Sequence, residues 1–231
     1  MYRHLFFDAD GTLFDFDQAE HHAFWAMAEA LGLSLTQEHE SLYKMCNLSC
    51  WKAFEQGTLT VETLKSRRFE LFSQESGILL DASQASRLYQ HHLSLQGILY
   101  PHSRDLLKTL KNRGYVLYLA SNGIAEVQHG RIEAAGIAGY FEHIFISEEI
   151  GYQKPDPRFF EAMMSAASLH TQKELCLMIG DSLSSDIAGG VAYGIDTLWL
   201  NLGDSNAPAS EAATYTLTSL EAIGELLVKA Q

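Results

Sequence analysis

Cysteine, basic residues and long apolar runs are all scarce in this chain of 231 residues. Three cysteines, an odd number in a chain of this size, do not indicate a framework of disulfide bonds. Cys46 and Cys50 are four residues apart and would share the face of a helix. Because no second pair of zinc ligands accompanies them, we expect buried or half-buried thiols rather than a zinc site. No apolar run approaches the length of a transmembrane helix.

Basic residues are also few. Lysine and arginine total 16 against 29 aspartates and glutamates, and the formal net charge is −13. This balance argues against a nucleic-acid polymer as a partner, because phosphate backbones require stripes of basic residues. A small phosphorylated substrate needs only a local positive site and is not excluded. Asp8 and Asp10 interrupt the first apolar run too early for a secretion signal. We therefore expect a soluble, cytoplasmic protein that does not bind membranes.

The first motif is a short apolar run, residues 5–7, followed by Asp8, Asp10 and Gly11. The run predicts a buried strand, and Gly11 permits a sharp turn just beyond the acids. Side chains at alternate positions of an extended segment point the same way, so Asp8 and Asp10 should face a common point. Two such carboxylates repel each other unless a cation or a proton lies between them, and Mg²⁺ suits such a site. Taken alone, the motif is equally compatible with a surface loop.

Residues 16–97 carry helical periodicity and no convincing strand. The predicted helices cover residues 18–31, 38–55, 61–74 and 83–95. The adjacent histidine pairs in this region lack partner acids at metal-ligating spacing, so we interpret them as ordinary helix residues. Hydrophobic residues make up 47% of the chain, enough for a sizeable core, and its length suits one domain with a large insertion or two small domains. We predict a helical insertion of residues 16–97 in a core formed by residues 1–15 and 98–231.

The rest of the chain alternates short apolar strands with helices. Strands are predicted at residues 115–120, 143–146, 175–179, 197–200 and 214–217, and helices at 104–112, 125–135, from 157 onwards, 186–193 and 219–229. This alternation predicts an α/β fold with a doubly wound parallel sheet and helices on both faces. In such sheets, ligands bind beyond the carboxyl ends of the strands.

Residues suited to phosphate chemistry follow four of these strands. In chain order they are Asp8 and Asp10, then Ser121 and Asn122, then Lys154, and finally Asp181 with Asp186 in the next helical turn. Because the carboxyl ends of parallel strands meet at one edge of a sheet, we expect these carboxylates, hydroxyl and ammonium groups to converge. Their agreement makes the surface-loop interpretation of the first motif much less favourable.

The chain resembles the haloacid dehalogenase-like hydrolases in four motifs. They are Asp8-Ala9-Asp10-Gly11-Thr12, Ser121-Asn122-Gly123, Lys154-Pro155 and Gly180-Asp181-Ser182-Leu183-Ser184-Ser185-Asp186. All four occur in the family's order and span most of the predicted core. The helical insertion resembles the α-helical cap of this family. Within this family, the second motif together with residues 145–157 is most similar to the pyrimidine 5′-nucleotidases.

The resemblance implies a phosphomonoesterase that works through an aspartyl-phosphate. Asp8 would be the nucleophile, and Asp10 would be the general acid and then the general base. The implied cofactor is Mg²⁺, held by Asp8, Asp10 and Asp181, with the backbone carbonyl of Asp10 as the contact expected in the family. Asp186 would orient these ligands from behind, and direct binding of Asp186 to the metal is the alternative.

The remaining site residues would bind the phosphate of the substrate. Ser121 and Asn122 would donate hydrogen bonds to its oxygens, and Lys154 would neutralise charge on the nucleophile and on the phosphoryl group. The implied partner is a small phosphorylated metabolite, with pyrimidine nucleoside monophosphates as the first choice. We expect a monomer or a small homo-oligomer.

Several alternatives stay open. A phosphatase for sugar phosphates or other small metabolites and a phosphoglucomutase-like enzyme would use the same paired aspartates. A dehalogenase releases halide, which needs no protonation, so Asp10 favours an oxygen leaving group. A phospho-acceptor signalling domain would need neither Asp10 nor the helical insertion. Phe24, Trp25 and Trp51 are candidates for stacking on a nucleotide base, although packing between helices is favoured for each.

Overall fold

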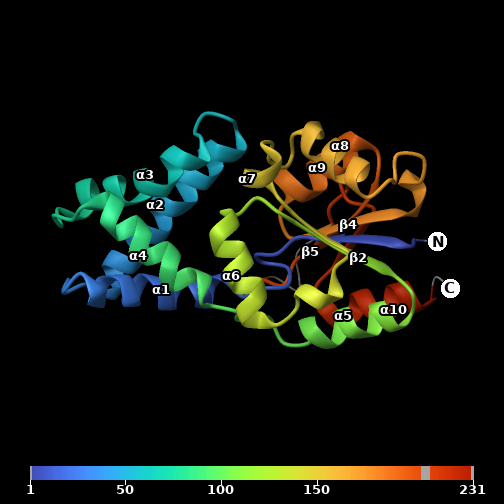
Figure 1. Cartoon of the computed structure of the whole chain (residues 1–231), viewed down its shortest axis with the longest axis horizontal. Helices are drawn as coiled ribbons and strands as arrows, with labels where there is room; N and C mark the ends of the chain where they lie inside the picture. Colours follow the sequence, from blue (N-terminus) through green and yellow to red (C-terminus); the bar gives the residue numbers. More distant parts are fainter. Residues whose placement is uncertain (1, 204–208, 230–231) are drawn as a thin grey trace.

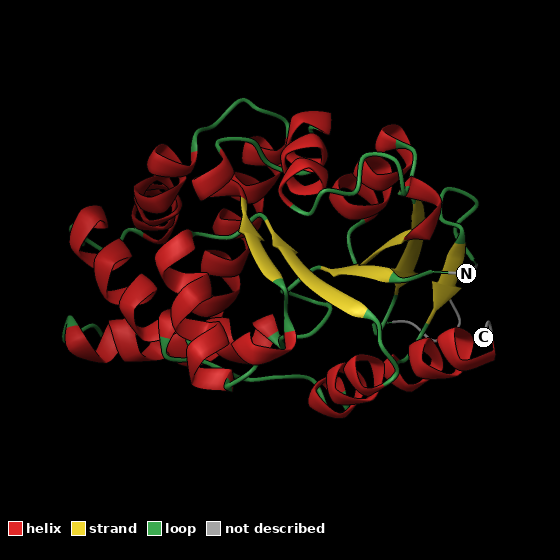
Figure 2. Ribbon diagram, turned by 45° about the vertical axis from the view of Figure 1, so that its right-hand side comes forward, coloured by secondary structure: helices red, strands yellow, loops and turns green. Residues whose placement is uncertain are grey.

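The computed structural model describes residues 2–203 and 209–229. Within these ranges, six parallel strands form one sheet in the order β3-β2-β1-β4-β5-β6 (Figure 2). The strands are β1 His4–Phe7, β2 Val116–Ser121, β3 His143–Ile146, β4 Cys176–Gly180, β5 Asp196–Leu200 and β6 Tyr215–Leu217. The predicted α/β fold with a parallel sheet is confirmed, and the later strands lie within one residue of their predicted bounds.

The helices also follow the predicted order. They are α1 Phe16–Ala30, α2 Gln37–Glu55, α3 Val61–Ser76, α4 Ala82–Ser94, α5 Ser103–Asn112, α6 Ala125–Ala135, α7 Ser147–Ile150, α8 Pro157–Ala166, α9 Ala188–Tyr193 and α10 Leu220–Lys229. Four short pieces were not predicted, namely α7, 3-10 helices at Ala138–Tyr140 and Lys173–Leu175, and a π-helical segment at Leu183–Ile187 just before α9. All four are shorter than the window over which helical periodicity can be recognised.

The central strand β1 is buried on both faces of the sheet. Leu5 and Phe7 join a cluster with α5 and α10 that includes Leu107 and Ile223. Phe6 points the other way, because alternate side chains of a strand face opposite sides, and it packs in a cluster with Phe160 of α8. Figure 1 shows the two layers, with α5 and α10 below the sheet and α8 and α9 above it. Burial on both faces explains why the strands are almost continuously apolar.

Helices α1 to α4 form a bundle with an aromatic centre, at the left of Figure 1. The Tyr43 ring stacks on those of Phe24 and Phe69, with both pairs of centroids 5.0 Å apart. Helix α6 lies between the bundle and the sheet. Its Val127 belongs to the buried cluster of the bundle, whereas its Ile132 belongs to the cluster on one face of the sheet.

The chain leaves the sheet for the bundle and returns along two adjacent segments. The Asp15 amide donates to the Ile98 carbonyl at 3.0 Å, and Phe14 and Leu99 form an antiparallel bridge. We propose that the helical insertion begins and ends at this pair of segments, near residues 15 and 98, as the sequence suggested.

Three details bear on the other expectations from sequence. Cys46 and Cys50 are both buried free thiols, as predicted. His21 belongs to one of the histidine pairs that we interpreted as ordinary helix residues, and its Nδ1 lies 2.8 Å from Glu40 Oε1 of α2. In the part of the chain that the structure describes, no helix combines the length and the apolar character needed to cross a bilayer.

Candidate active site

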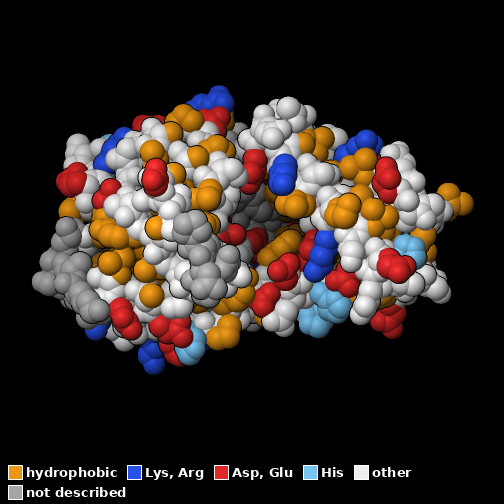
Figure 3. Space-filling view, turned by 180° about the vertical axis from the view of Figure 1, so that it is seen from behind, with side chains coloured by type: hydrophobic (Ala, Val, Ile, Leu, Met, Phe, Trp, Pro, Cys, Tyr) orange, Lys and Arg blue, Asp and Glu red, His pale blue; other side chains and the backbone are white. Residues whose placement is uncertain are grey.

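The carboxyl ends of β1, β2 and β4 border a cavity of about 460 Å³ between the sheet and the bundle. Figure 3 shows a hollow in the surface with acidic side chains around it. The sheet side of the cavity brings together every site residue singled out in the sequence, namely Asp8, Asp10, Ser121, Asn122, Lys154, Asp181 and Asp186. Its position matches the crevice in which open parallel sheets bind their ligands.

Lys154 joins two of the carboxylates. Its Nζ donates to Asp8 Oδ1 at 2.6 Å, to Asp186 Oδ1 at 2.7 Å and to the Ala120 carbonyl at 2.5 Å. The side chain is only 1% exposed. Burial by itself would lower the pKa of this ammonium, but the charges of Asp186 and Asp8 outweigh burial and raise the pKa above its ordinary value. Lys154 therefore stays charged and can neutralise an anion bound beside Asp8.

Asp8, Asp181 and Asp186 form an acidic cluster. Among the described residues, these three each place a carboxylate oxygen within 4.8 Å of the other two. Burial raises the pKa of Asp8 despite the opposing charge of Lys154, and the charges of Asp186 and Asp181 raise it further. Burial and the charge of Asp186 raise the pKa of Asp181 to about 7. Lys154 thus balances only part of the negative charge, and a hard divalent cation suits what is left.

Two glycines leave room for this cluster. Gly11 has a φ of +79°, which side chains rarely adopt, and a Cβ at this position would collide with the Asp181 carboxylate. A Cβ at Gly180 would collide with the Asp186 carboxylate. The backbone therefore approaches the acids as closely as it does only because both residues lack a side chain.

The Asp10 carboxylate is held by helix α6. Gln128 Nε2 donates to Asp10 Oδ2 at 2.6 Å, and Arg131 Nη1 donates to Asp10 Oδ1. The fully buried Arg131 guanidinium lies over the Phe14 ring, 4.6 Å from its centroid, and its Nε donates to the Gln96 carbonyl. Asp10 therefore lines the same cavity as the acidic cluster while its carboxylate is bonded to α6.

Sequence reasoning did not find Gln128 and Arg131. Both lie in the helix predicted at residues 125–135, and neither belongs to a motif. The only signal in the sequence was their spacing of three residues, which places both side chains on one face of the helix. Such a polar pair is common on solvated helices, whereas here both side chains are buried.

Asn122 and Ser121 make contacts within the site. The Asn122 side chain donates from Nδ2 to the Lys154 carbonyl and accepts from the Lys154 amide at Oδ1, both at 2.8 Å. Asn122 thus fixes the backbone that carries the lysine, a contact that the sequence did not indicate. Ser121 Oγ accepts a hydrogen bond from the Gly123 amide at 3.0 Å, which leaves the hydroxyl hydrogen available to a ligand in the cavity.

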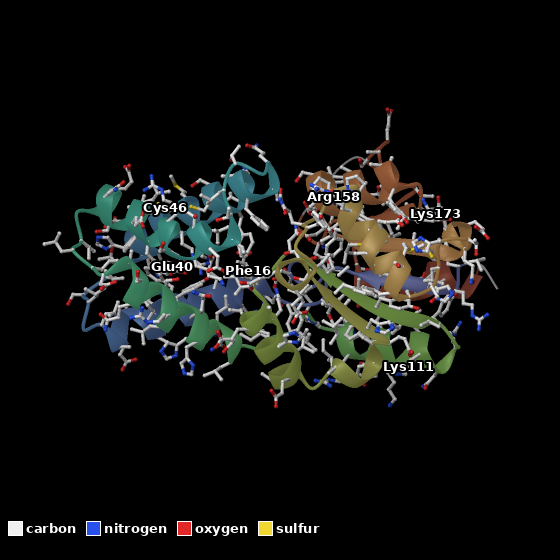
Figure 4. All side chains as sticks on the ribbon, turned by 45° about the horizontal axis from the view of Figure 1, so that its top comes forward. Phe16, Glu40, Cys46, Lys111, Arg158 and Lys173 are labelled. Atoms are coloured by element: carbon white, nitrogen blue, oxygen red, sulfur yellow. The ribbon has the colours of Figure 1, made fainter. Side chains whose placement is uncertain are left out.

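The bundle supplies the opposite wall of the cavity, which is lined by Phe16, Asp17, Leu48, Trp51 and Glu55. Figure 4 shows Phe16 where the bundle meets the sheet. Of the aromatic candidates, Trp51 reaches the cavity. Phe24 is fully buried in the bundle, and Trp25 Nε1 donates to Glu40 Oε2 at 2.9 Å. Packing within the bundle, as favoured from sequence, thus describes all three, and Trp51 differs in that it also lines the cavity.

The fold and this cavity agree with a comparison of the sequence with known families. The model of the haloacid dehalogenase-like hydrolases matches residues 2–194. The chain therefore belongs to this family and is a hydrolase, as the four motifs indicated.

Two similar curated proteins are pyrimidine 5′-nucleotidases. PynA of Streptococcus pneumoniae is 36% identical over 228 residues, which cover 99% of this chain and 96% of PynA. YjjG of Escherichia coli is 29% identical over 225 residues, which cover 97% of each protein. Both alignments include the sheet and the bundle. The predicted likeness to this group of enzymes is confirmed.

A similar solved structure is that of the putative HAD-hydrolase YfnB from Bacillus subtilis, described as bound to magnesium and as revealing interdomain movement. It superposes with a TM-score of 0.90 and 32% sequence identity, and the match covers 98% of this chain and 99% of that one. A relative with nearly the same fold therefore binds the ion that suits the acidic cluster described above.

Proposed function

We propose that the chain is a Mg²⁺-dependent phosphomonoesterase for pyrimidine nucleoside 5′-monophosphates. The observation that carries the proposal is the charge of the cavity. Lys154 is the one cation among the described residues that line it, and it is bonded to Asp8. The other charged lining residues are six carboxylates, two of them, Asp17 and Glu55, on the bundle side. One phosphate fits beside Lys154, but a second anionic group would be repelled.

This charge distribution separates the candidate substrates. Haloacids and phosphoserine carry a carboxylate, for which the bundle side offers no cation among its described lining residues. A pyrimidine nucleoside is uncharged and presents a flat ring whose faces can stack, which suits a wall that contains Phe16 and Trp51. Sugar phosphates also lack a second charge, but they have no such ring. The nucleotidases PynA and YjjG, similar over nearly their whole length, add support for a nucleotide.

In the proposed reaction, an Asp8 oxygen attacks phosphorus and the ester P–O bond breaks, which leaves an aspartyl-phosphate. Asp10 gives a proton to the departing alkoxide and then accepts one from a water molecule. That water attacks the same phosphorus, the bond to Asp8 breaks, and inorganic phosphate is formed. Lys154 offsets the charge on Asp8 and on the transferring group, and Ser121 donates a hydrogen bond to a phosphoryl oxygen. Gln128 and Arg131 orient Asp10.

The residues present fit Mg²⁺. Asp8 and Asp181, together with the backbone carbonyl of Asp10, would hold the ion. Asp186 accepts hydrogen bonds from Lys154 Nζ at 2.7 Å and from the Ser182 amide at 3.1 Å, which suits a role in orienting the other ligands. When bound, Mg²⁺ supplies positive charge that offsets the acids and the phosphoryl oxygens.

Mg²⁺ is expected to stabilise the protein more as the pH rises from about 5 to about 8. The pKa of Asp181 is about 7 in the folded state, above the ordinary value for aspartate. The metal-free folded state therefore holds a proton that the unfolded state has lost, and its free energy of unfolding falls as the pH rises through this window. Mg²⁺ binds the deprotonated acids and opposes this loss.

The measurement is the midpoint of thermal unfolding across this pH range, with MgCl₂ or with a chelator. Asp181→Asn serves as the control, because it removes the titrating group and should flatten the pH dependence of the metal-free protein. An equal gain from Mg²⁺ at the two ends of the range would contradict the assignment of this metal site.

Phosphate release from a panel of substrates tests the proposed function. We expect the highest kcat/KM for uridine and cytidine 5′-monophosphates, a lower value for ribose 5-phosphate, and very little release from phosphoserine. Chelation of Mg²⁺ should stop the reaction. Halide release from 2-chloropropionate or conversion of glucose 1-phosphate to its 6-phosphate would favour the dehalogenase or the mutase instead. Absence of release from every nucleotide would refute the proposal.

A further inference from the structure

One face of helix α2 forms part of the cavity wall. Leu48, Trp51 and Glu55 are spaced by three and four residues, so they lie on the same side of the helix. All three line the cavity. Because a helix rises about 1.5 Å per residue, Glu55 lies about 6 Å beyond Trp51 along the helix axis. This face therefore presents a carboxylate, an indole and an aliphatic side chain in a fixed order.

The carboxylate end of this face lies close to the phosphate-binding residues. Ser184 Oγ, from the π-helical segment that follows β4, donates to Glu55 Oε2 at 3.1 Å. Burial is the largest influence on the pKa of Glu55 and raises it above its ordinary value, although the Ser184 hydrogen bond lowers it. Glu55 lines the same cavity as Lys154 and Asp186. It is only half-buried, which leaves it able to accept a hydrogen bond from a ligand.

The Trp51 indole lies about one helical turn before Glu55 along α2. Trp51 is held edge-on against the Phe54 ring, with centroids 5.7 Å apart and planes at 83°. It borders the main cavity and also a small neighbouring cavity, and Phe16 lines both. Leu48 is 55% exposed although it is a large apolar side chain, and it forms the outer end of this face. An apolar surface held in place and left partly open in this way suits a flat ring.

We propose that this face of α2 recognises the nucleoside part of the substrate, with Trp51 packed against the pyrimidine ring and Glu55 accepting a hydrogen bond from a sugar hydroxyl. The order of side chains matches the order of groups in a 5′-nucleotide, in which the sugar lies between the phosphate and the base. Leu48 covers the outer part of the base. The inference rests on the proposed nucleotidase function and goes further by assigning the residues that select the substrate.

Trp51→Ala tests the contact with the base through a ratio of substrates. Stacking of a base on an aromatic side chain is worth enough that the ratio of kcat/KM for uridine 5′-monophosphate to that for ribose 5-phosphate should fall about 10- to 100-fold. Trp51→Phe keeps an aromatic face and should retain most of the ratio. This second variant keeps the test valid if the alanine variant folds poorly. Trp25→Phe is the matched control, because Trp25 lies on the bundle away from the cavity and its replacement should leave the ratio unchanged.

Glu55→Ala tests the contact with the sugar in the same way. A hydrogen bond to a charged acceptor is worth about tenfold or more, so preference for uridine 5′-monophosphate over its 2′,3′-dideoxy analogue should fall by that factor. Glu55→Gln keeps an acceptor oxygen and should restore part of the preference. A loss caused by misfolding alone would lower kcat/KM for both nucleotides equally.

The outcomes distinguish a wrong assignment of α2 from a wrong assignment of the enzyme's function. If the wild-type protein hydrolyses uridine 5′-monophosphate but Trp51→Ala leaves the substrate ratio unchanged, the assignment of α2 is wrong and the nucleotidase function stands. If Glu55→Ala leaves the sugar preference unchanged, the assignment of Glu55 is wrong. If the wild-type protein turns over no nucleotide, the proposed function and this inference both fall.

Discussion

Replacement of Asp8 by asparagine is expected to lower phosphate release by about 10⁴-fold or more, because a nucleophile removed from a group that acts as a unit leaves little residual catalysis. The amide cannot attack phosphorus. Among the described residues, Asp186 is the one other carboxylate bonded to Lys154, and in the proposed arrangement it lies behind the site. The variant should fold, since asparagine has the same shape and its oxygen can still accept from Lys154. Initial rates of phosphate release on uridine 5′-monophosphate provide the measurement.

The matched control for this variant is Asp10→Asn with p-nitrophenyl phosphate as substrate. p-Nitrophenolate leaves without protonation, so the first step should survive the loss of the acid while the second step lacks its base. Asp10→Asn should therefore give a burst of p-nitrophenolate followed by slow turnover, and Asp8→Asn should give no burst. Substantial turnover by Asp8→Asn on either ester would show that another group is the nucleophile.

Replacement of Lys154 by methionine is expected to destabilise the protein by about 3–5 kcal/mol, as is usual when one partner of a buried ion pair is removed. Asp8 and Asp186 would be left close together without the ammonium that bonds to both, at 2.6 and 2.7 Å. The free energy of unfolding, measured with urea in the presence of a chelator, gives the size of the effect. Activity should be lost as well, because Lys154 is the only cationic side chain among the described residues that line the cavity, and no other side chain there can offset the charge of the phosphoryl group beside Asp8.

The double variant Lys154→Met, Asp186→Asn sharpens this test. It removes one of the two unpaired buried charges, so it should be more stable than Lys154→Met alone while remaining inactive. A Lys154→Met protein as stable as the wild type would mean that the three charges do not form the network described here.

The sheet and the meeting of the site residues could be predicted because both depend on simple periodicity. Strands buried on both faces appear as apolar runs, and their order along the chain suffices to place Ser121, Lys154 and Asp181 at one edge. The direction of a side chain beyond the end of a strand is harder to predict. Gly11 turns the backbone at positive φ immediately after Asp10, and the Asp10 carboxylate is bonded to Arg131, a residue far along the chain.

The aromatic residues of the bundle illustrate a second limit. Phe24, Trp25 and Trp51 had equal standing in the sequence, since each lies in an amphipathic helix. The surroundings of each side chain depend on how its helix is rotated about its axis and on which neighbouring element covers it. Phe24 faces the centre of the bundle, Trp25 is bonded to Glu40, and Trp51 faces the cavity. Helical periodicity predicts which residues share the apolar face of a helix, but it does not predict which element or cavity lies against that face.

The adjacent segments at Asp15 and Ile98 have a consequence for how this enzyme can diversify. Because the backbone enters and leaves the bundle through a hydrogen-bonded pair of segments, the proposed insertion of about eighty residues is closed at its base. In the proposed arrangement, substitutions in the bundle change the recognition of the substrate while the groups that cleave the ester keep their mutual arrangement. A new substrate preference can therefore arise through changes in α2 without loss of the catalytic groups.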